Sequence, residues 1–203
     1  METIRVLVAD DQALIRGALQ ALLDLNDDLE VVAAVGSGDA VVPAALEHRP
    51  DVALLDVQMP GLDGLAAAAA LRERMPSCRV IIVTTFGRPG YLRRAMEAGA
   101  TGFLIKDAAP EALAEAIRRV HAGLRVVDPE LATESLTLGT SPLSGRERDV
   151  LVAAVGGATV AQLARRLFLS EGTVRNHLSA AIGKTGASTR AEAVRLADER
   201  GWL

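Results

Sequence analysis

Polar residues of different chemical kinds follow four short apolar runs in the first half of the sequence. Asp10 and Asp11 follow the run IRVLVA, and Asp56, Thr84 and Lys106 each end another run. The carboxyl ends of neighbouring strands in a parallel sheet open onto one crevice, where ligands of open α/β folds usually bind. If the runs form neighbouring strands, three carboxylates, a hydroxyl and an ammonium meet in that crevice.

This set of side chains suits the transfer of a phosphoryl group to a carboxylate. An aspartate can attack phosphorus and form an acyl phosphate, and Asp56 is the candidate acceptor. A divalent cation is needed because the acids and the incoming group repel one another. Mg2+ takes oxygen ligands from carboxylates, waters and phosphates. We expect Asp11 and Asp56 to bind it directly, Asp10 to bind it directly or through water, and the main-chain carbonyl of Gln58 to add a ligand.

The two remaining polar side chains suit the oxygens of the transferred group. Lys106 would balance their negative charge, and Thr84 would donate a hydrogen bond to one of them. Each residue alone is weak evidence, since an aspartate at the end of a strand is often a helix cap and a threonine is often an ordinary strand residue. The ordered set, with each member at the end of a strand, is specific.

Strand-like and helix-like patterns alternate over residues 1–122 and predict five consecutive βα units. This favours a flavodoxin-like doubly wound parallel sheet with strand order 2-1-3-4-5, which places strands one, three, four and five around the crevice. The predicted strands are 4–9, 30–35, 51–55, 79–84 and 102–105. The predicted helices lie near 12–24, 38–48, 64–75, 88–98 and 110–122.

The pattern changes after residue 122. Residues 123–141 contain scattered glycines, a proline and a Thr/Ser-rich stretch, which predict a linker. Residues 142–203 then predict a small all-α domain of four helices, near 145–155, 160–167, 171–184 and 190–200. The second and third helices are joined by only three residues, as a helix-turn-helix requires.

The starts of these four helices carry capping signals. Three of them show the S/T-x-x-E/Q pattern of a capping box. The fourth has Ser170 as a plain N-cap, and Gly186 is the expected C-cap of the same helix. The predicted boxes are Ser144 with Glu147, Thr159 with Gln162, and Thr189 with Glu192.

Charge and composition separate the two halves. From residue 142 onward there are nine basic and six acidic residues, a formal charge of +3, whereas the rest of the chain carries 13 basic and 20 acidic residues, or −7. A basic helical half favours double-stranded DNA as its partner. Cys78 is the only cysteine, and no signal peptide or membrane-length apolar run is found, so we expect no disulfide, no membrane partner and a cytoplasmic location.

The helix after the tight turn, 171–184, is the expected reader of the major groove. Arginine pairs with guanine and asparagine with adenine, so Arg175 and Asn176 are the candidate base readers. Ser179 lies on a face of the same helix other than its apolar one. Thr173 and Lys184 are the candidate phosphate contacts. These five side chains are the predicted DNA-binding set.

The motifs VLVADD, LLDVQMPGLDG, VIIVTTF and GFLIKD together resemble the receiver domain of bacterial two-component response regulators, over residues 1 to about 122. The resemblance implies that a sensor histidine kinase phosphorylates Asp56 with Mg2+. It also makes Asp10 and Asp11 the acidic pair, Thr84 the switch hydroxyl and Lys106 the phosphate-binding lysine. A further residue, Phe103, occupies the position of the family's switch aromatic.

The second half resembles the helix-turn-helix of the LuxR/NarL type over about 55 residues, through LSGRERDVL and VAQLARRLFLSEGTVRNHLSAAIGKTGASTRAEAV. Thr185 departs from it, since the family usually has an apolar residue there. Both halves in this order resemble a response regulator of the NarL/LuxR (FixJ) type. This implies a transcription regulator that is not an enzyme and that forms a homodimer on activation.

Three other functions fit the sequence less well. A regulator of the same family that works without phosphorylation conflicts with the intact acidic set. A phosphatase or phosphotransferase of the haloacid dehalogenase type would use D-x-D, but Gln58 stands two residues after Asp56, and the basic half would go unexplained. A nucleotide-binding protein is disfavoured because the G-x-x-x-x-G-K-[ST] loop is missing.

Overall fold

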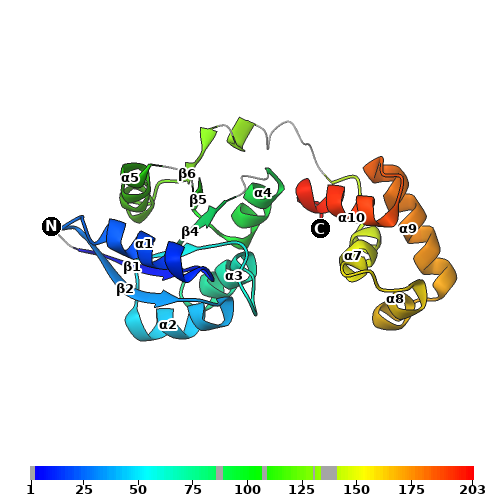
Figure 1. Cartoon of the computed structure of the whole chain (residues 1–203), viewed down its shortest axis with the longest axis horizontal. Coiled ribbons are helices and arrows are strands. Elements are labelled where there is room, and N and C mark those ends of the chain that lie inside the picture. The colour runs from blue at the N-terminus through cyan, green and yellow to red at the C-terminus, as the bar shows by residue number, and fades with distance from the viewer. Residues whose placement is uncertain (1–2, 86–88, 107–108, 130, 134–140) are drawn as a thin grey trace. The chain divides into compact units, whose positions relative to one another are not determined.

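The computed structural model describes residues 3–85, 89–106, 109–129, 131–133 and 141–203, which form two compact units (Figure 1). The sheet unit contains strands β1 to β6 and helices α1 to α5. The helical unit contains helices α7 to α10. Within the described part of the chain, none of the helices has the length and apolarity needed to cross a membrane.

All strands of the sheet unit are parallel, in the order β2-β1-β3-β4-β5-β6. The predicted order of the first five strands and the flavodoxin-like architecture are confirmed. The sixth strand lies in the segment that the sequence analysis treats as linker. The strands are β1 (Ile4–Ala9), β2 (Leu29–Val35), β3 (Val52–Leu55), β4 (Arg79–Thr84), β5 (Gly102–Ile105) and β6 (Val126–Val127).

Helices cover the sheet, because its strands are apolar on both faces. Alternate residues of a strand point to opposite faces, and on one face the side chains of five strands, β1 to β5, form a single core with α1 (Ala13–Leu23) and α5 (Pro110–His121). Phe103 has the opposite parity and points to the other face, where it is fully buried. The remaining elements of this unit are the short 3-10 helix η1 (Gly38–Ala40) and helices α2 (Val41–His48), α3 (Gly64–Arg74) and α4 (Pro89–Ala98).

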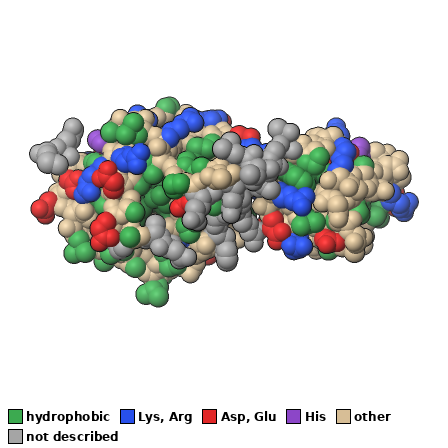
Figure 2. All heavy atoms as spheres, turned by 90° about the horizontal axis from the view of Figure 1, so that it is seen from above, with side chains coloured by type: hydrophobic (Ala, Val, Ile, Leu, Met, Phe, Trp, Pro, Cys, Tyr) green, Lys and Arg blue, Asp and Glu red, His purple; other side chains and the backbone are tan. Residues whose placement is uncertain are grey.

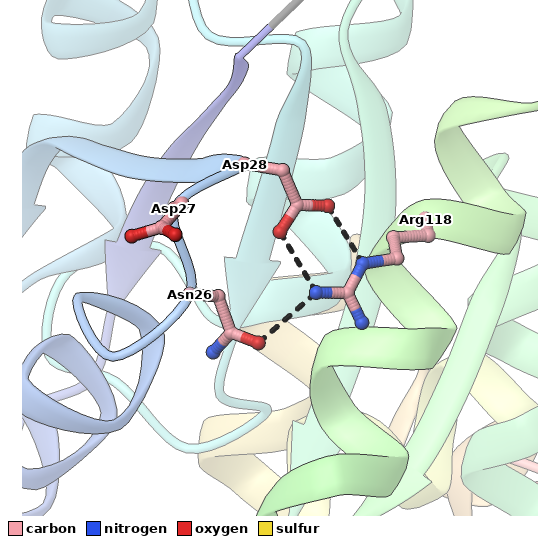
Figure 3. A pocket seen from close by; sticks show the side chains of 4 residues that line it. All are labelled: Asn26, Asp27, Asp28 and Arg118. Atoms are coloured by element: carbon pink, nitrogen blue, oxygen red, sulfur yellow. Dashed lines mark hydrogen bonds and ion pairs between the residues drawn. The ribbon is translucent and has the colours of Figure 1, made fainter. Parts of the chain in front are cut away.

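A bidentate ion pair fastens α5 to the start of β2 (Figure 3). The guanidinium of Arg118 donates from Nε and Nη2 to the two carboxylate oxygens of Asp28, at 2.7 and 2.8 Å, and from Nη2 to Oδ1 of Asn26 at 3.0 Å. These hydrogen bonds hold the pKa of Asp28 below its ordinary value. Asp27 turns away from the guanidinium in the same view. The pair therefore connects segments that are 90 residues apart.

The helical unit packs its four helices around one apolar core, as predicted. Ser144 and Thr159 form complete capping boxes, and Ser170 caps its helix as expected. The third predicted box is one-sided, because Glu192 accepts from the backbone N–H of Ser188 and not from that of Thr189. The helices are α7 (Gly145–Ala154), α8 (Val160–Leu167), α9 (Glu171–Thr185) and α10 (Arg190–Glu199).

Glu147 links the first helix of this unit to the third. Its carboxylate accepts from the backbone N–H of Ser144 at 2.7 Å, and both of its oxygens accept from Nζ of Lys184, at 2.9 and 2.7 Å. The residue is buried although it is charged. The hydrogen bond from Lys184 is the main reason that the pKa of Glu147 lies below its ordinary value of 4.5.

We predict that Lys184→Met lowers the free energy of unfolding of the helical unit by about 1 kcal/mol at pH 7, since it leaves a buried carboxylate without its cation while solvent screens part of the loss. A carboxylate whose pKa is lowered on folding stabilises the native state above its ordinary pKa, and this contribution is lost as the pH falls through the lowered value. The difference between variant and wild type should therefore shrink below pH 4.5. Denaturant titrations at several pH values measure it.

Arg195→Met is the matched control. It removes the cation of an exposed pair with Glu199, at 2.9 Å and one helical turn apart. Such pairs contribute at most about 0.5 kcal/mol. An equal loss in both variants would mean that the burial of Glu147 contributes nothing special.

Candidate functional site

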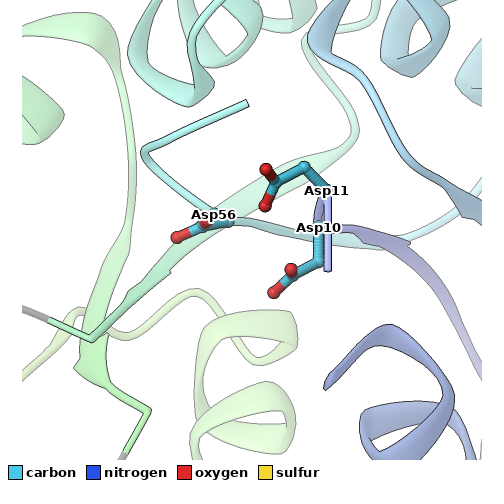
Figure 4. A group of neighbouring side chains, drawn as sticks. All are labelled: Asp10, Asp11 and Asp56. Carbon is cyan, nitrogen blue, oxygen red and sulfur yellow. The ribbon is translucent and has the colours of Figure 1, made fainter. Parts of the chain in front are cut away.

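Three carboxylates meet at the carboxyl ends of β1 and β3 (Figure 4). Asp10 and Asp11 follow β1, and Asp56 follows β3. The backbone N–H of Asp10 donates to the carbonyl of Val35 at 3.1 Å, and that of Asp56 donates to the carbonyl of Ala9 at 2.9 Å. The sheet hydrogen bonding thus continues through the acids and fixes them. Each carboxylate offers an oxygen within 4.8 Å of those of the other two, a separation that suits one cation.

Lys106 supplies a positive charge on the other side of this cluster. Its Nζ lies 2.6 Å from Oδ2 of Asp10 and 3.3 Å from Oδ1 of Asp56. All three side chains are almost entirely buried, with exposed fractions of 7% for the lysine and 1% and 6% for the acids. The backbone N–H of Lys106 donates to the carbonyl of Thr84 at 2.7 Å, which ties the end of β5 to the end of β4. Little water screens the attraction between these charges, and this attraction offsets part of the cost of burying them.

Burial raises the pKa of Asp56 above its ordinary value. Lys106 acts in the opposite direction, and the neighbouring charge of Asp10 raises the pKa further. One lysine thus faces two buried carboxylates, and the exposed Asp11 brings a third negative charge nearby. The site carries excess negative charge, and an added cation would stabilise it.

Asp10 is also held from α1. Its Oδ1 accepts from the backbone N–H of Gln12 at 2.9 Å, and its carbonyl accepts from Nη1 of Arg16. Arg16 was not predicted from the sequence, because an arginine on an amphipathic helix carries no signal of its contact with a carbonyl six residues earlier. The contact secures the first turn of α1 against the acidic pair.

Gly64 lets α3 begin directly against the phosphoacceptor candidate. A Cβ atom at this position would lie 1.9 Å from the carbonyl oxygen of Asp56, so no other residue fits without displacing the backbone. Its N–H donates to the carbonyl of Val57 at 3.0 Å, and Asp63 caps the helix by accepting from Ala66 at 2.7 Å. The glycine is part of the LLDVQMPGLDG motif, but its role became clear only from the close contact.

The other predicted residues of this site differ in how far they are buried. Thr84 is buried at the end of β4, and Phe103 is fully buried in β5. Gln58 is exposed in the segment between β3 and α3. The structure therefore brings together Asp10, Asp11, Asp56 and Lys106 by direct contact or by ligand distance, with Thr84 joined to Lys106 through the backbone.

The predicted DNA-reading residues lie on α9. Arg175, Asn176 and Ser179 are exposed, and Thr173 is half-buried near the helix start. The core is contacted instead by the apolar stripe of the same helix, which includes Val174 and Leu178. The exposed face of α9 is thus polar and available to a ligand.

Three of these residues already have intramolecular partners, and one of them is Thr173, whose hydroxyl lies 2.8 Å from the hydroxyl of Ser170. Arg175 pairs with Glu171 one turn earlier, at 2.7 Å, and both side chains are exposed. Such a pair contributes at most about 0.5 kcal/mol, so a ligand can replace it. Lys184 uses two of its three donors on Glu147, as described above. The ion pair between Lys184 and Glu147 was not predicted from the sequence, since the two residues are 37 positions apart.

Both halves of the chain match known families. Residues 6–118 match the response regulator receiver domain. Residues 141–197 match the bacterial regulatory proteins of the luxR family. Together these matches span most of the chain.

Individual proteins show the same similarity over the full length. The transcriptional regulatory protein DesR of Bacillus subtilis (strain 168) is 42% identical over 98% of this chain and 99% of its own. A crystal structure of ChrA, the response regulator of a heme-sensing two-component system, is 34% identical with a TM-score of 0.60 and covers all of both chains. The structure of a complex of RcsB with DNA shares the fold, with 22% identity and a TM-score of 0.69 over 98% of this chain and 99% of that one.

From the geometry of the acidic cluster we predict that Asp56→Asn raises the thermal midpoint of the sheet unit by a few degrees at pH 7.5 without divalent cations. A carboxyl whose pKa is raised on folding destabilises the native state once it is ionised. The amide removes that charge, while Lys106 keeps Asp10 at 2.6 Å. Thermal unfolding followed by calorimetry measures the change.

Asp24→Asn is the control, because this exposed aspartate lies at the end of α1. Its midpoint should match wild type. A lower midpoint for Asp56→Asn would show that the contact with Lys106 outweighs the cost of burial.

Proposed function

The chain belongs to the response regulators with a LuxR-type DNA-binding domain, and from this premise we propose that phosphorylation of Asp56 controls how it binds DNA. Proteins of this family are transcriptional regulators and not enzymes. The proposal assigns residues 1–122 to the receiver, 123–141 to the linker and 142–203 to DNA binding. It places the protein in the cytoplasm, with a sensor histidine kinase as its partner.

The observation that carries the proposal is the pairing of a buried Asp56 with Lys106, beside two further acids. The Asp56 carboxylate would attack the phosphorus of a phosphohistidine, forming the acyl phosphate and releasing the kinase imidazole. Lys106 is within reach of the anionic oxygens of the new group, and the Thr84 hydroxyl is the proposed donor to one of them. Phe103 lies in β5, the strand that ends directly before Lys106, and is the proposed switch aromatic that reorients on phosphorylation.

Asp10, Asp11 and Asp56 are the proposed carboxylate ligands of Mg2+, with the main-chain carbonyl of Gln58 as a further ligand. Three carboxylate oxygens within 4.8 Å of one another, and their unbalanced negative charge, support a hard cation at this place. When bound, Mg2+ would neutralise charge that builds up during phosphoryl transfer.

On the output side, α9 is the proposed recognition helix. Arg175 and Asn176 are the proposed base readers, and Thr173, Ser179 and Lys184 complete the proposed contact set. The exposure of the first two supports the proposal, as does the weak intrahelical pair that holds Arg175. The ammonium group of Lys184 has three N–H donors, and two of them reach Glu147. The third donor can bind a phosphate oxygen.

Self-association is the proposed link between the two ends. Helix-turn-helix proteins read two half-sites with twofold symmetry, and the RcsB structure was solved with DNA. An apolar stripe on α1 is exposed in the single chain. Leu14 is 86% exposed, and Leu25, just past the helix, is 80% exposed. Two exposed alanines, Ala18 and Ala21, lie between them, and a face of this kind favours contact with another protein surface.

We predict that beryllofluoride with Mg2+ doubles the sedimenting mass of the wild-type chain and tightens its binding to a duplex selected from a random pool by about tenfold or more. Asp56→Ala should show neither change. Leu14→Asp should lose the change of mass and keep the reactivity of Asp56 with acetyl phosphate. Analytical ultracentrifugation and fluorescence anisotropy give the readouts. An unchanged wild type, or the same response in Asp56→Ala, would refute phosphorylation control.

A separate prediction concerns the cation. Asp11→Asn should weaken Mg2+ binding at least about tenfold, because an amide oxygen replaces an anionic ligand. Asp11 is exposed, so the variant should fold as wild type does. Isothermal titration of the full chain with MgCl2 measures the affinity, and Asp24→Asn serves as the control. Equal affinities in wild type and Asp11→Asn would remove Asp11 from the ligand set.

A further inference from the structure

Phe168, in the turn between α8 and α9, departs from two regularities of folded proteins at once. Its side chain is 95% exposed. Its φ of 55° lies in the left-handed region, which strains a bulky residue and favours glycine or asparagine. Neither property stabilises the helical unit. Local rules broken without a structural gain are expected at functional positions.

The turn itself is firmly built. The N–H of Phe168 donates to the carbonyls of Ala164 and Arg165, and the N–H of Leu169 donates to that of Ala164 at 2.9 Å, which closes the end of α8. Leu167 and Leu169 both pack against the core. The aromatic ring between them is thus held outward by a fixed backbone.

Two arginines precede Phe168 in the sequence. Arg165 and Arg166 are exposed in the last turn of α8, and Ser170, which caps the helix with the proposed base readers, follows two residues later. Basic side chains reach the surface of the helical unit (Figure 2). Cations beside an exposed aromatic ring complement a polyanion that also presents apolar atoms.

We infer that Phe168 is a DNA contact, whose ring packs on apolar atoms at the edge of the major groove. The inference rests on the proposed function of α9. In a helix-turn-helix the first helix crosses the phosphate backbone and the second enters the groove with its N-terminal end. Phe168, between these two helices, would therefore lie where the protein chain leaves the DNA phosphate backbone and enters the major groove. The apolar atoms available there are the C5-methyl group of thymine and the carbons of deoxyribose.

The test uses the full chain and the duplex selected by the wild-type protein. Phe168→Asn removes the ring and keeps a residue that tolerates positive φ, so its thermal midpoint should equal or exceed that of wild type. Its Kd for the duplex should rise about tenfold, through loss of apolar burial. The slope of log K against log salt should stay unchanged, because no phosphate contact is lost.

Two control arms sharpen the result. Val152→Gln exchanges another exposed apolar side chain, 49% exposed on α7, for an amide and should bind as wild type does. Duplexes with uracil in place of thymine separate the two kinds of apolar atom. If the ring contacts a methyl group, wild type loses affinity on the uracil duplex and Phe168→Asn does not. If it contacts deoxyribose, the variant loses the same factor on both duplexes.

A Kd for Phe168→Asn within twofold of wild type would overturn the inference. This includes the case in which Phe168→Asn binds DNA normally and only transcription fails, which would assign the ring to a protein partner. A different result tests the proposed function. A wild-type chain that selects no duplex refutes DNA reading, whereas selective wild-type binding with an unaffected variant refutes only the role of Phe168.

Discussion

The sheet unit is organised around one electrostatic constraint, the burial of two like charges with a single cation. Asp10 and Asp56 follow the adjacent strands β1 and β3, and both contact Lys106, which follows β5 on the far side of β4. The three side chains can meet only if β1, β3, β4 and β5 are parallel and end at the same level. The unequal balance, with two buried acids for one lysine, also makes the site responsive to any further charge.

The helical unit also buries a charged side chain beside a single cation. Glu147 is buried, but it accepts from a backbone N–H and from an ammonium, so its charge is compensated. The residue joins a helix cap to the end of the proposed recognition helix. Removing the cation would cost little compared with the apolar core around it, yet it would remove the ion pair that ties α9 to α7. If Lys184 also contacts DNA as proposed, stability and recognition depend on the same lysine.

The sequence predicted most of the fold because its signals are local. Apolar runs marked the first five strands, and apolar periodicity and capping residues marked the helices to within about two residues. The helix predicted at 38–48 is the exception, because its first three residues form the 3-10 helix η1. The strand β6 was missed, since two valines followed by a proline-containing segment carry too little pattern. Contacts between distant positions were missed for another reason. The pair of Arg118 with Asp28 and that of Lys184 with Glu147 depend on how elements pack, and no spacing in the chain encodes it. For the candidate site, the identity of the strand-end residues predicted their convergence. The close approach of Gly64 to Asp56 could not be predicted in this way, because it depends on how the chain packs in three dimensions.

The short strand β6 has a consequence for solubility. Without it, β5 would present an open row of backbone donors and acceptors at the edge of the parallel sheet, which is a template for pairing with another chain. Val126 and Val127 occupy part of that edge, and the N–H of Asp128 reaches the carbonyl of Phe103 at 3.4 Å. A strand of two residues, flanked by Arg125 and Asp128, is too short and too charged to recruit a further strand. The segment that contains β6 thereby protects the edge of the sheet against aggregation.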